Sequence, residues 1–296
     1  MFYLLRGSIC AVTLSLTSPS AQAQTLFESR SGSGIFSDHE TGAIEEYSPG
    51  GTQNTFYSGL YPAGLAFNSA GNLFEANYGN GSINEFTPDG AGINFVTGLS
   101  FPFGLAFSSV GTLFETDQGS GSIYEFTPGG IKTTFATGLV KPYQLAFNNA
   151  GNLFVADDGS GNIYEYTPGG TRSTFASGLS NPVGLAIDSS GDVFETDYGS
   201  SSINEFTPGG MKTTFASGLP LPFSLAFNNA GDLFEVGWGG TINEFTPGGV
   251  QSVFANGPGN TTYLAFSPVP EPVPPTFSIL AVGILALFVR RRKLAA

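Results

Sequence analysis

An internal repeat of about 40 residues constrains the fold of this chain more than any other feature. A motif of Glu, an aromatic residue, Ser or Thr, and Pro begins at Glu46, Glu85, Glu125, Glu165, Glu205 and Glu244. A second motif, Leu-Ala followed by Phe or Ile, keeps the same phase and begins at Leu65, Leu105, Leu145, Leu185, Leu225 and Leu264. Two motifs that recur together at this period indicate an array of equivalent structural units.

One period contains four short runs of strand-forming residues, which in the second repeat are 64–67, 73–76, 83–86 and 93–96. Glycine-rich turns separate them, and Pro88 ends the third run because proline cannot donate to a strand ladder. Glycines and prolines interrupt every run before it reaches the length that a repeat of paired helices needs. Four short strands in about 40 residues are typical of a propeller blade.

The two ends of the array are complementary. The first repeat offers strand-like runs at 26–28, 44–47 and 55–57 but no first strand, whereas the chain's last run, 263–266, is an isolated first strand. One strand from the C-terminal end and three from the N-terminal end complete a sixth blade. We therefore predict an all-β, six-bladed propeller of four-stranded blades, a closed ring that exposes no sheet edge at the junction of its ends.

The repeat resembles a known family. The pattern Pro-x-Gly-Leu-Ala-Phe/Ile with a following Gly, Phe and Asp, as from Pro182 to Asp197, resembles NHL-type repeats and the streptogramin-lyase-like six-bladed propellers. The resemblance spans about residues 26–267 and implies the fold. It does not fix the activity, because this fold serves ligases, lyases, lactonases and plain scaffolds.

The N-terminal segment, residues 1–23, has the layout of a secretory signal peptide. Arg6 supplies the positive charge, residues 9–16 form a short apolar core, and Ala21 and Ala23 fit the small-x-small cleavage rule. The apolar core is too short to span a bilayer. We expect export across the inner membrane and a propeller domain of residues 24–268.

The C-terminal segment, residues 269–296, combines three ordered features. Pro270-Glu271-Pro272 precedes the apolar run 277–289, and the basic cluster Arg290, Arg291, Arg292 and Lys293 follows it. This layout resembles the PEP-CTERM sorting signal. The resemblance implies an apolar helix, recognition by an exosortase-type sorting enzyme, transient membrane anchoring, and delivery to the surface or matrix of a Gram-negative-type bacterium. A simple C-terminal membrane anchor is the alternative.

Charge and cysteine content exclude several classes of function. Residues 24–275 carry 5 basic and 23 acidic residues, a net charge of −18, which would repel nucleic acid. Cys10 lies in the leader, so the exported chain has no thiol for a disulfide, a metal site or nucleophilic catalysis. We expect a monomer without a cofactor.

The loops that join the second strand to the third, and the fourth strand to the next blade, lie on one face of such a disc and differ between blades. Variation confined to one face favours a binding site there. Its carboxylates and aromatic rings would suit a glycan or a protein ligand. The candidate binding residues are Tyr78, Asp117, Lys141, Tyr143, Asp157, Asp158, Asn181, Asp197, Tyr198 and Trp238. Alternatively, Asp117, Asp157 and Asp197 cap their own turns.

Other carboxylates recur at fixed strand positions, as Glu75, Glu115, Glu195 and Glu235 do in the second strands. Such carboxylates suit Ca²⁺, but recurrence in successive blades favours a structural role in hydrogen bonding. The single histidine, His39, lies in an irregular segment outside the repeat, so a Ser-His-Asp relay is not expected.

We therefore predict a binding or scaffold propeller rather than an enzyme. The alternative is a metal-assisted lactonase or lyase that uses the four loop aspartates, of which Asp158 has no counterpart in the other blades.

Overall fold

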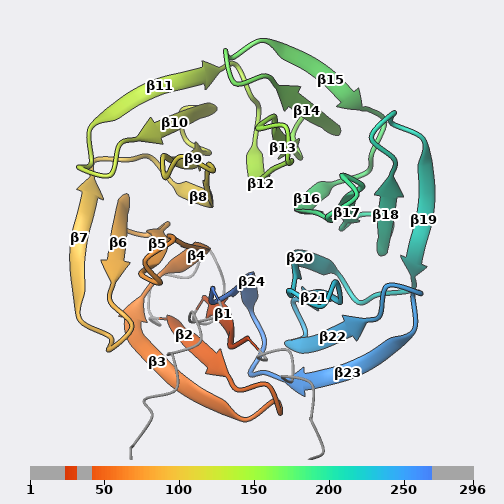
Figure 1. Cartoon of the computed structure of the whole chain (residues 1–296), viewed down its shortest axis with the longest axis horizontal. Helices are drawn as coiled ribbons and strands as arrows, with labels where there is room; N and C mark the ends of the chain where they lie inside the picture. Colours follow the sequence, from red (N-terminus) through yellow and green to blue (C-terminus); the bar gives the residue numbers. More distant parts are fainter. Residues whose placement is uncertain (1–23, 32–41, 269–296) are drawn as a thin grey trace, which may run out of the picture.

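The computed structural model describes residues 24–31 and 42–268, and these residues form six four-stranded antiparallel sheets around a central axis (Figure 1). The predicted fold is confirmed. The leader, His39 and the whole sorting segment lie outside the described ranges. Within those ranges, no helix is long and apolar enough to cross a membrane.

Each sheet is one blade, and its strands run in order from the axis outward. Blade A contains β24 (Thr261–Phe266), β1 (Leu26–Arg30), β2 (Gly42–Tyr47) and β3 (Gln53–Leu60). Blade B contains β4 (Pro62–Phe67), β5 (Leu73–Asn77), β6 (Ser82–Phe86) and β7 (Gly92–Thr97). Blade C contains β8 (Pro102–Phe107), β9 (Leu113–Asp117), β10 (Ser122–Phe126) and β11 (Lys132–Thr137).

The other three blades follow the same order. Blade D contains β12 (Pro142–Phe147), β13 (Leu153–Asp157), β14 (Asn162–Tyr166) and β15 (Arg172–Ala176). Blade E contains β16 (Pro182–Ile187), β17 (Val193–Asp197), β18 (Ser202–Phe206) and β19 (Lys212–Ser217). Blade F contains β20 (Pro222–Phe227), β21 (Leu233–Gly237), β22 (Thr241–Phe245) and β23 (Gln251–Asn256).

Blade A closes the ring as the sequence predicts. β24 pairs antiparallel with β1, and the register places Leu26 opposite Phe266 and Ser29 opposite Tyr263. The Ser29 and Thr262 hydroxyl groups lie 2.8 Å apart, and Ser29 also donates to the Ala63 carbonyl oxygen of blade B. The two ends of the array are therefore joined to each other and to the next blade.

Phenylalanine rings fill the wedge between neighbouring blades. Between blades C and D, Phe114 meets Phe135 and Phe147 edge to face, with ring centroids 5.1 and 5.0 Å apart. Four of the other five wedges hold an equivalent triad, and Ile187 replaces the third ring between blades D and E. This repeated packing accounts for the high phenylalanine content.

Side chains of the innermost strands close the central axis. Gln144 of blade D links blades E and F. Its amide donates to the Leu225 carbonyl oxygen and accepts from the Leu185 backbone nitrogen. The Tyr263 hydroxyl donates to the Leu105 carbonyl oxygen across the ring. The axis is therefore part of the packed core.

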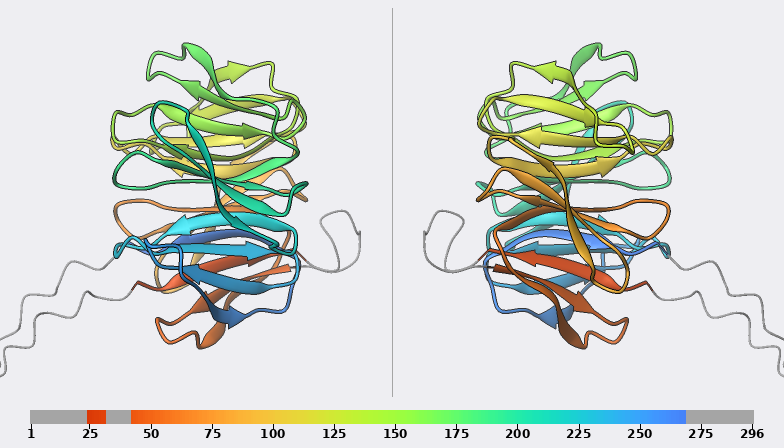
Figure 2. Two further views of the ribbon diagram at one scale, coloured as in Figure 1. Left: turned by 90° about the vertical axis from the view of Figure 1, so that its right-hand side faces the viewer. Right: turned by 90° about the vertical axis from the view of Figure 1, so that its left-hand side faces the viewer.

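The disc has two faces, which Figure 2 shows from the side. The mouth face consists of the loops that join second to third strands and fourth strands to the next blade. The base face consists of the loops that join first to second and third to fourth strands. The Ser267 backbone nitrogen donates to the Thr25 carbonyl oxygen at 2.9 Å, so both ends of the propeller leave from the base face.

Candidate functional site

Each blade presents one pair of non-repeating residues at the mouth face. In blade D the Asp158 backbone nitrogen donates to the Lys141 carbonyl oxygen at 3.1 Å, which extends the β12–β13 hairpin by one pair. The corresponding pairs in the other blades are Tyr61 with Tyr78, Phe101 with Gln118, Asn181 with Tyr198, Leu221 with Trp238, and Asn260 with Ser31. The mouth is therefore a ring of variable residues on an invariant scaffold.

A cavity of about 270 Å³ opens within this ring above blades D, E and F. It is lined by Lys141, Tyr143, Asp158, Asn181, Val183, Tyr198, Phe223 and Trp238. The volume suits a single sugar ring or one amino-acid side chain, since drug-sized ligands occupy roughly 300–1,000 Å³.

Asp158 organises the polar side of the cavity. One carboxylate oxygen lies 3.0 Å from Lys141 Nζ, and the other accepts a 2.6 Å hydrogen bond from the Asn181 amide of the next blade. Lys141 also lies over the Tyr143 ring, 5.0 Å from its centroid. Burial alone would lower the pKa of Lys141, but Tyr143 and Asp158 outweigh it and raise that pKa to about 12, so the ammonium group stays charged.

Aromatic rings form the rest of the cavity. Tyr198 and Trp238 both meet Phe223 edge to face, with centroids 6.3 and 6.2 Å apart. Below them Phe103 and Tyr143 pack at 4.6 Å and close the top of the central axis. The negative faces of such rings attract the weakly positive C–H groups of a ligand.

Two bulky residues on the rim adopt the left-handed backbone conformation that glycine normally occupies. Phe101 has a φ of 58° and Leu221 a φ of 53°, and their side chains are 50% and 42% exposed. Tyr78 stacks beside Phe101 at 5.0 Å. A strained backbone costs of order 1–3 kcal/mol and is concentrated at ligand sites, so these exposed apolar side chains support a role for the mouth in binding.

Three of the candidate residues are buried and cap turns, as the alternative hypothesis for the loop aspartates predicts. Asp117 accepts from the Ser100 and Ser120 backbone nitrogens. Asp157 and Asp197 bind the equivalent turns of their blades. Of the other candidates, Lys141, Tyr143, Asp158, Asn181, Tyr198 and Trp238 line the cavity, and Tyr78 lies on the rim.

The recurring second-strand glutamates are buried, and most are hydrogen-bonded. Glu75, Glu195 and Glu235 accept from the amides of Asn84, Asn204 and Asn243 on the neighbouring third strand. The predicted structural role holds for these three. In residues 24–31 and 42–268, no three His, Cys, Asp or Glu side chains lie close enough together to hold a metal ion.

Val183 and Phe223 line the cavity although they are absent from the predicted set. They occupy the second position of the first strand, where successive blades carry Ala63, Phe103, Tyr143, Val183 and Phe223 before an invariant Leu two residues later. Variation at that position, inside an otherwise repeated strand, is the signal that identifies the floor of the mouth.

The sequence matches no established family profile and no curated protein. The structure is similar to solved propellers. A chain of a nidogen/laminin complex matches with a TM-score of 0.73 at 20% identity, covering 83% of this chain and 100% of that one. This chain shares the six-bladed propeller fold.

Two bacterial enzymes share this fold. A catalytically inactive histidine-to-alanine variant of virginiamycin B lyase from Staphylococcus aureus, solved with quinupristin, matches with a TM-score of 0.62 at 16% identity over 84% of this chain and 94% of that one. A gluconolactonase from Xanthomonas campestris matches with a TM-score of 0.65 at 17% identity over 80% and 87%. At such low identities the structural similarity indicates a shared fold and does not indicate a shared activity.

Proposed function

We propose that this chain is an exported binding propeller of the cell surface or extracellular matrix, and that its mouth binds a glycan. The observation on which the proposal rests is a ring of residues that differ between blades and surround a cavity with aromatic walls. A sugar presents C–H groups to aromatic faces and hydroxyl groups to polar edges, which suits Tyr198 and Trp238 beside the Lys141–Asp158–Asn181 group.

The charge of the mouth favours an uncharged sugar. Lys141 and Asp158 compensate each other at 3.0 Å, while Asp117, Asp157 and Asp197 are buried in their turns. The residues that line the cavity therefore carry no net charge. A neutral ligand binds without large desolvation of charge, so we expect the affinity to depend weakly on salt.

A glycan array tests this function. We expect the full chain to retain one class of neutral glycan, and Trp238→Ala or Tyr198→Ala to reduce that binding at least about tenfold, the scale of a lost aromatic anchor. Ser69→Ala on the base face is the matched control and should bind normally. If the array retains no glycan, and the chain instead captures a protein whose binding Trp238→Ala abolishes, then the ligand of the mouth is a protein and not a glycan.

The proposed export and sorting depend on segments 1–23 and 269–296. Mass spectrometry of the mature protein from its own cells should find a chain that begins at Gln24 and lacks the peptide 280–296. Recovery of that peptide from the mature protein would favour a simple anchor over exosortase processing.

The metal-assisted lactonase or lyase stays an alternative hypothesis with its own test. It requires a divalent ion at the loop aspartates. Metal analysis of the purified protein, and its melting temperature with and without Ca²⁺, should show no bound ion and no shift under our proposal. Lactone hydrolysis that is lost in Asp158→Asn would support the alternative.

A further inference from the structure

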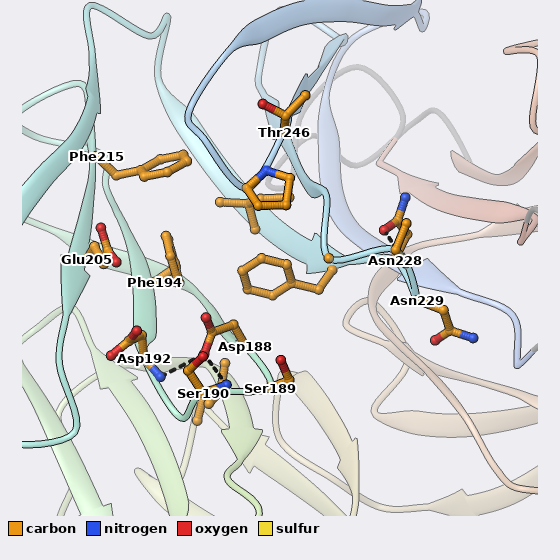
Figure 3. A pocket seen from close by; sticks show the side chains of 16 residues that line it. Asp188, Ser189, Ser190, Asp192, Phe194, Glu205, Phe215, Asn228, Asn229 and Thr246 are labelled. Atoms are coloured by element: carbon orange, nitrogen blue, oxygen red, sulfur yellow. Dashed lines mark hydrogen bonds between the residues drawn. The ribbon is translucent and has the colours of Figure 1, made fainter. Parts of the chain in front are cut away.

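A second cavity, of about 670 Å³, lies on the base face between blades E and F (Figure 3). Its apolar floor is a phenylalanine triad in which Phe194 meets Phe215 and Phe227, each at 5.2 Å and edge to face. A similar cavity of about 520 Å³ lies between blades C and D over Phe114, Phe135 and Phe147. We call the first cavity the E/F groove and the second the C/D groove.

The E/F groove differs from its counterparts in charge. In blades B and D an asparagine holds the third-strand glutamate, since Asn72 donates to Glu85 and Asn152 to Glu165, both at 2.7 Å. Asp192 occupies that position in blade E, beside Glu205. The exchange replaces a donor with a second negative charge.

Asp188 adds a third carboxylate, and one of its oxygens caps the Ser190 and Asp192 backbone nitrogens. In the described part of the chain, the only two salt bridges are Arg30–Glu45 and Lys141–Asp158, so no cation compensates this group. The C/D groove carries Ser108 and Thr112 at the positions of Asp188 and Asp192. Blade F repeats the exchange at one position, where Asp232 lies near Glu244, but it carries Asn228 in place of Asp188. The apolar floor therefore repeats, whereas among blades B to F only blade E has all three carboxylates.

The acidic groove lies next to the point where the chain leaves the propeller. The Gln24 side chain donates to the Ser267 carbonyl oxygen at 2.7 Å and accepts from the Asn229 backbone nitrogen at 2.6 Å. Asn229 lines the E/F groove. The segment that follows residue 268 therefore starts beside this cavity.

We propose that the E/F groove docks the chain's own C-terminal segment, with apolar residues of the run 277–289 on the phenylalanine floor and arginines of 290–292 at the carboxylate rim. This segment is both apolar and basic, and the groove is apolar and acidic. Of the ten basic residues in the sequence, four lie in this segment. The proposal concerns the chain before the sorting segment is removed, and it is independent of what binds at the mouth.

Because the segment is tethered to the propeller, even a weak affinity is enough for it to occupy the groove. The nine residue-to-residue steps from 268 to 277 reach about 30 Å when extended, at roughly 3.3–3.6 Å per residue. A short tether gives a millimolar effective concentration, so a dissociation constant of about 1 mM keeps the groove half occupied. Docking and membrane insertion exclude each other, because the same apolar run cannot occupy both sites.

Disulfide trapping in the full chain tests the contact. Cys10→Ser removes the only native thiol, and Ser278→Cys with Ser189→Cys places one thiol in the segment and one on the groove. We expect rapid intramolecular crosslinking, slowed at least about tenfold by Asp188→Ser with Asp192→Thr. That double variant copies the C/D groove, where the Ser108 hydroxyl caps the Thr112 backbone nitrogen, so it keeps one of the two caps that Asp188 makes. Circular dichroism should show a folded chain with a closely similar melt.

Further measurements distinguish docking in the E/F groove from insertion into lipid and from chance encounter of the two thiols. Addition of phosphatidylcholine vesicles should suppress the crosslink as the segment inserts into lipid, and 1 M salt should slow it because the rim contact is electrostatic. A crosslinking rate that the double variant leaves unchanged would mean that the tether alone brings the thiols together, and the proposal would fail. Absence of any crosslink without lipid would also overturn it. Glycan binding at the mouth should be the same in all these variants.

Discussion

At the scale of single residues, Glu115 is the least satisfied buried carboxylate among residues 24–31 and 42–268. Both of its carboxylate oxygens are buried without a hydrogen-bond partner, because Tyr124 occupies the position of the asparagine that holds Glu75 in blade B. Burial, with Asp117 nearby, raises the pKa of Glu115 well above its ordinary value. Blade D avoids the conflict, since Val155 lies opposite Tyr164 there.

We predict that Glu115→Val stabilises the propeller, because it reproduces the Val155–Tyr164 pair and removes an unsatisfied buried carboxyl group. The expected gain in the free energy of unfolding is about 1–3 kcal/mol, measured by urea denaturation. Glu195→Val is the matched control and should lose stability, since it leaves the Asn204 amide without its acceptor. A loss in both variants would contradict this explanation.

The sequence predicts residues well where their contacts are local. Asp117, Asp157 and Asp197 each accept a hydrogen bond from the serine three residues later, as the Asx pattern predicts. The pattern does not predict their second set of bonds, to the loop that precedes the first strand of the same blade. It does not predict that Val183 and Phe223 join Lys141 around one cavity. These residues come together only because three blades pack around the axis, and no local sequence pattern predicts that packing.

At the scale of strands, five of the six blades have a buried glutamate in the second strand. Burial raises the pKa of Glu75 and of Glu195 to about 8 and that of Glu235 to about 7, although an asparagine hydrogen bond opposes the shift in each. The folded state therefore favours the protonated acid, whereas the unfolded chain ionises near its ordinary pKa of 4.5.

We predict that the propeller is more stable at pH 5 than at pH 9. The stabilisation by the protonated acids is complete below about pH 4.5 and is lost as the pH rises to about 8. Urea denaturation across this range should show the decline. The triple variant Glu75→Gln, Glu195→Gln and Glu235→Gln should make the decline shallower, with Glu28 and Glu115 accounting for the remainder. An unchanged slope would contradict the assignment.

The first strands depend on glycine where neighbouring blades approach at the axis. A Cβ atom on Gly184 would lie 2.6 Å from Thr196 Oγ1 and 2.7 Å from the Phe223 carbonyl oxygen. Gly184→Ala should cost about 1–3 kcal/mol, seen as a lower melting temperature. Gly50→Ala, where nothing lies within 4 Å of the added atom, should leave the melt unchanged. Equal effects would argue against close approach at the axis.

At the scale of the whole molecule, closure of the ring depends on a single strand from the far end of the chain. β24 covers β1, and the Tyr47 and Thr261 hydroxyl groups donate to the buried Glu28 carboxylate at this junction. The sequence predicts this closure, because the two incomplete repeats add up to one blade. It does not predict the charge difference between the six inter-blade grooves, which appears only when each wedge is assembled.

We predict that a chain ending at Gly259 loses the closed ring, because β1 then becomes an exposed sheet edge and Glu28 loses the Thr261 hydroxyl. Light scattering should detect aggregation, and thermal unfolding should become broad. A chain ending at Pro268 retains β24 and should unfold cooperatively. Similar melts for the two chains would contradict closure by β24.

Trp238 is the only tryptophan of the chain, and it lines the mouth cavity. Its emission therefore reports directly on the proposed binding site. The decisive measurement is a titration of the full chain with the neutral glycan that the array selects, followed by tryptophan fluorescence and calorimetry together. The account predicts a saturable emission change whose midpoint equals the calorimetric dissociation constant. Calorimetric binding that leaves the emission of Trp238 unchanged would contradict it.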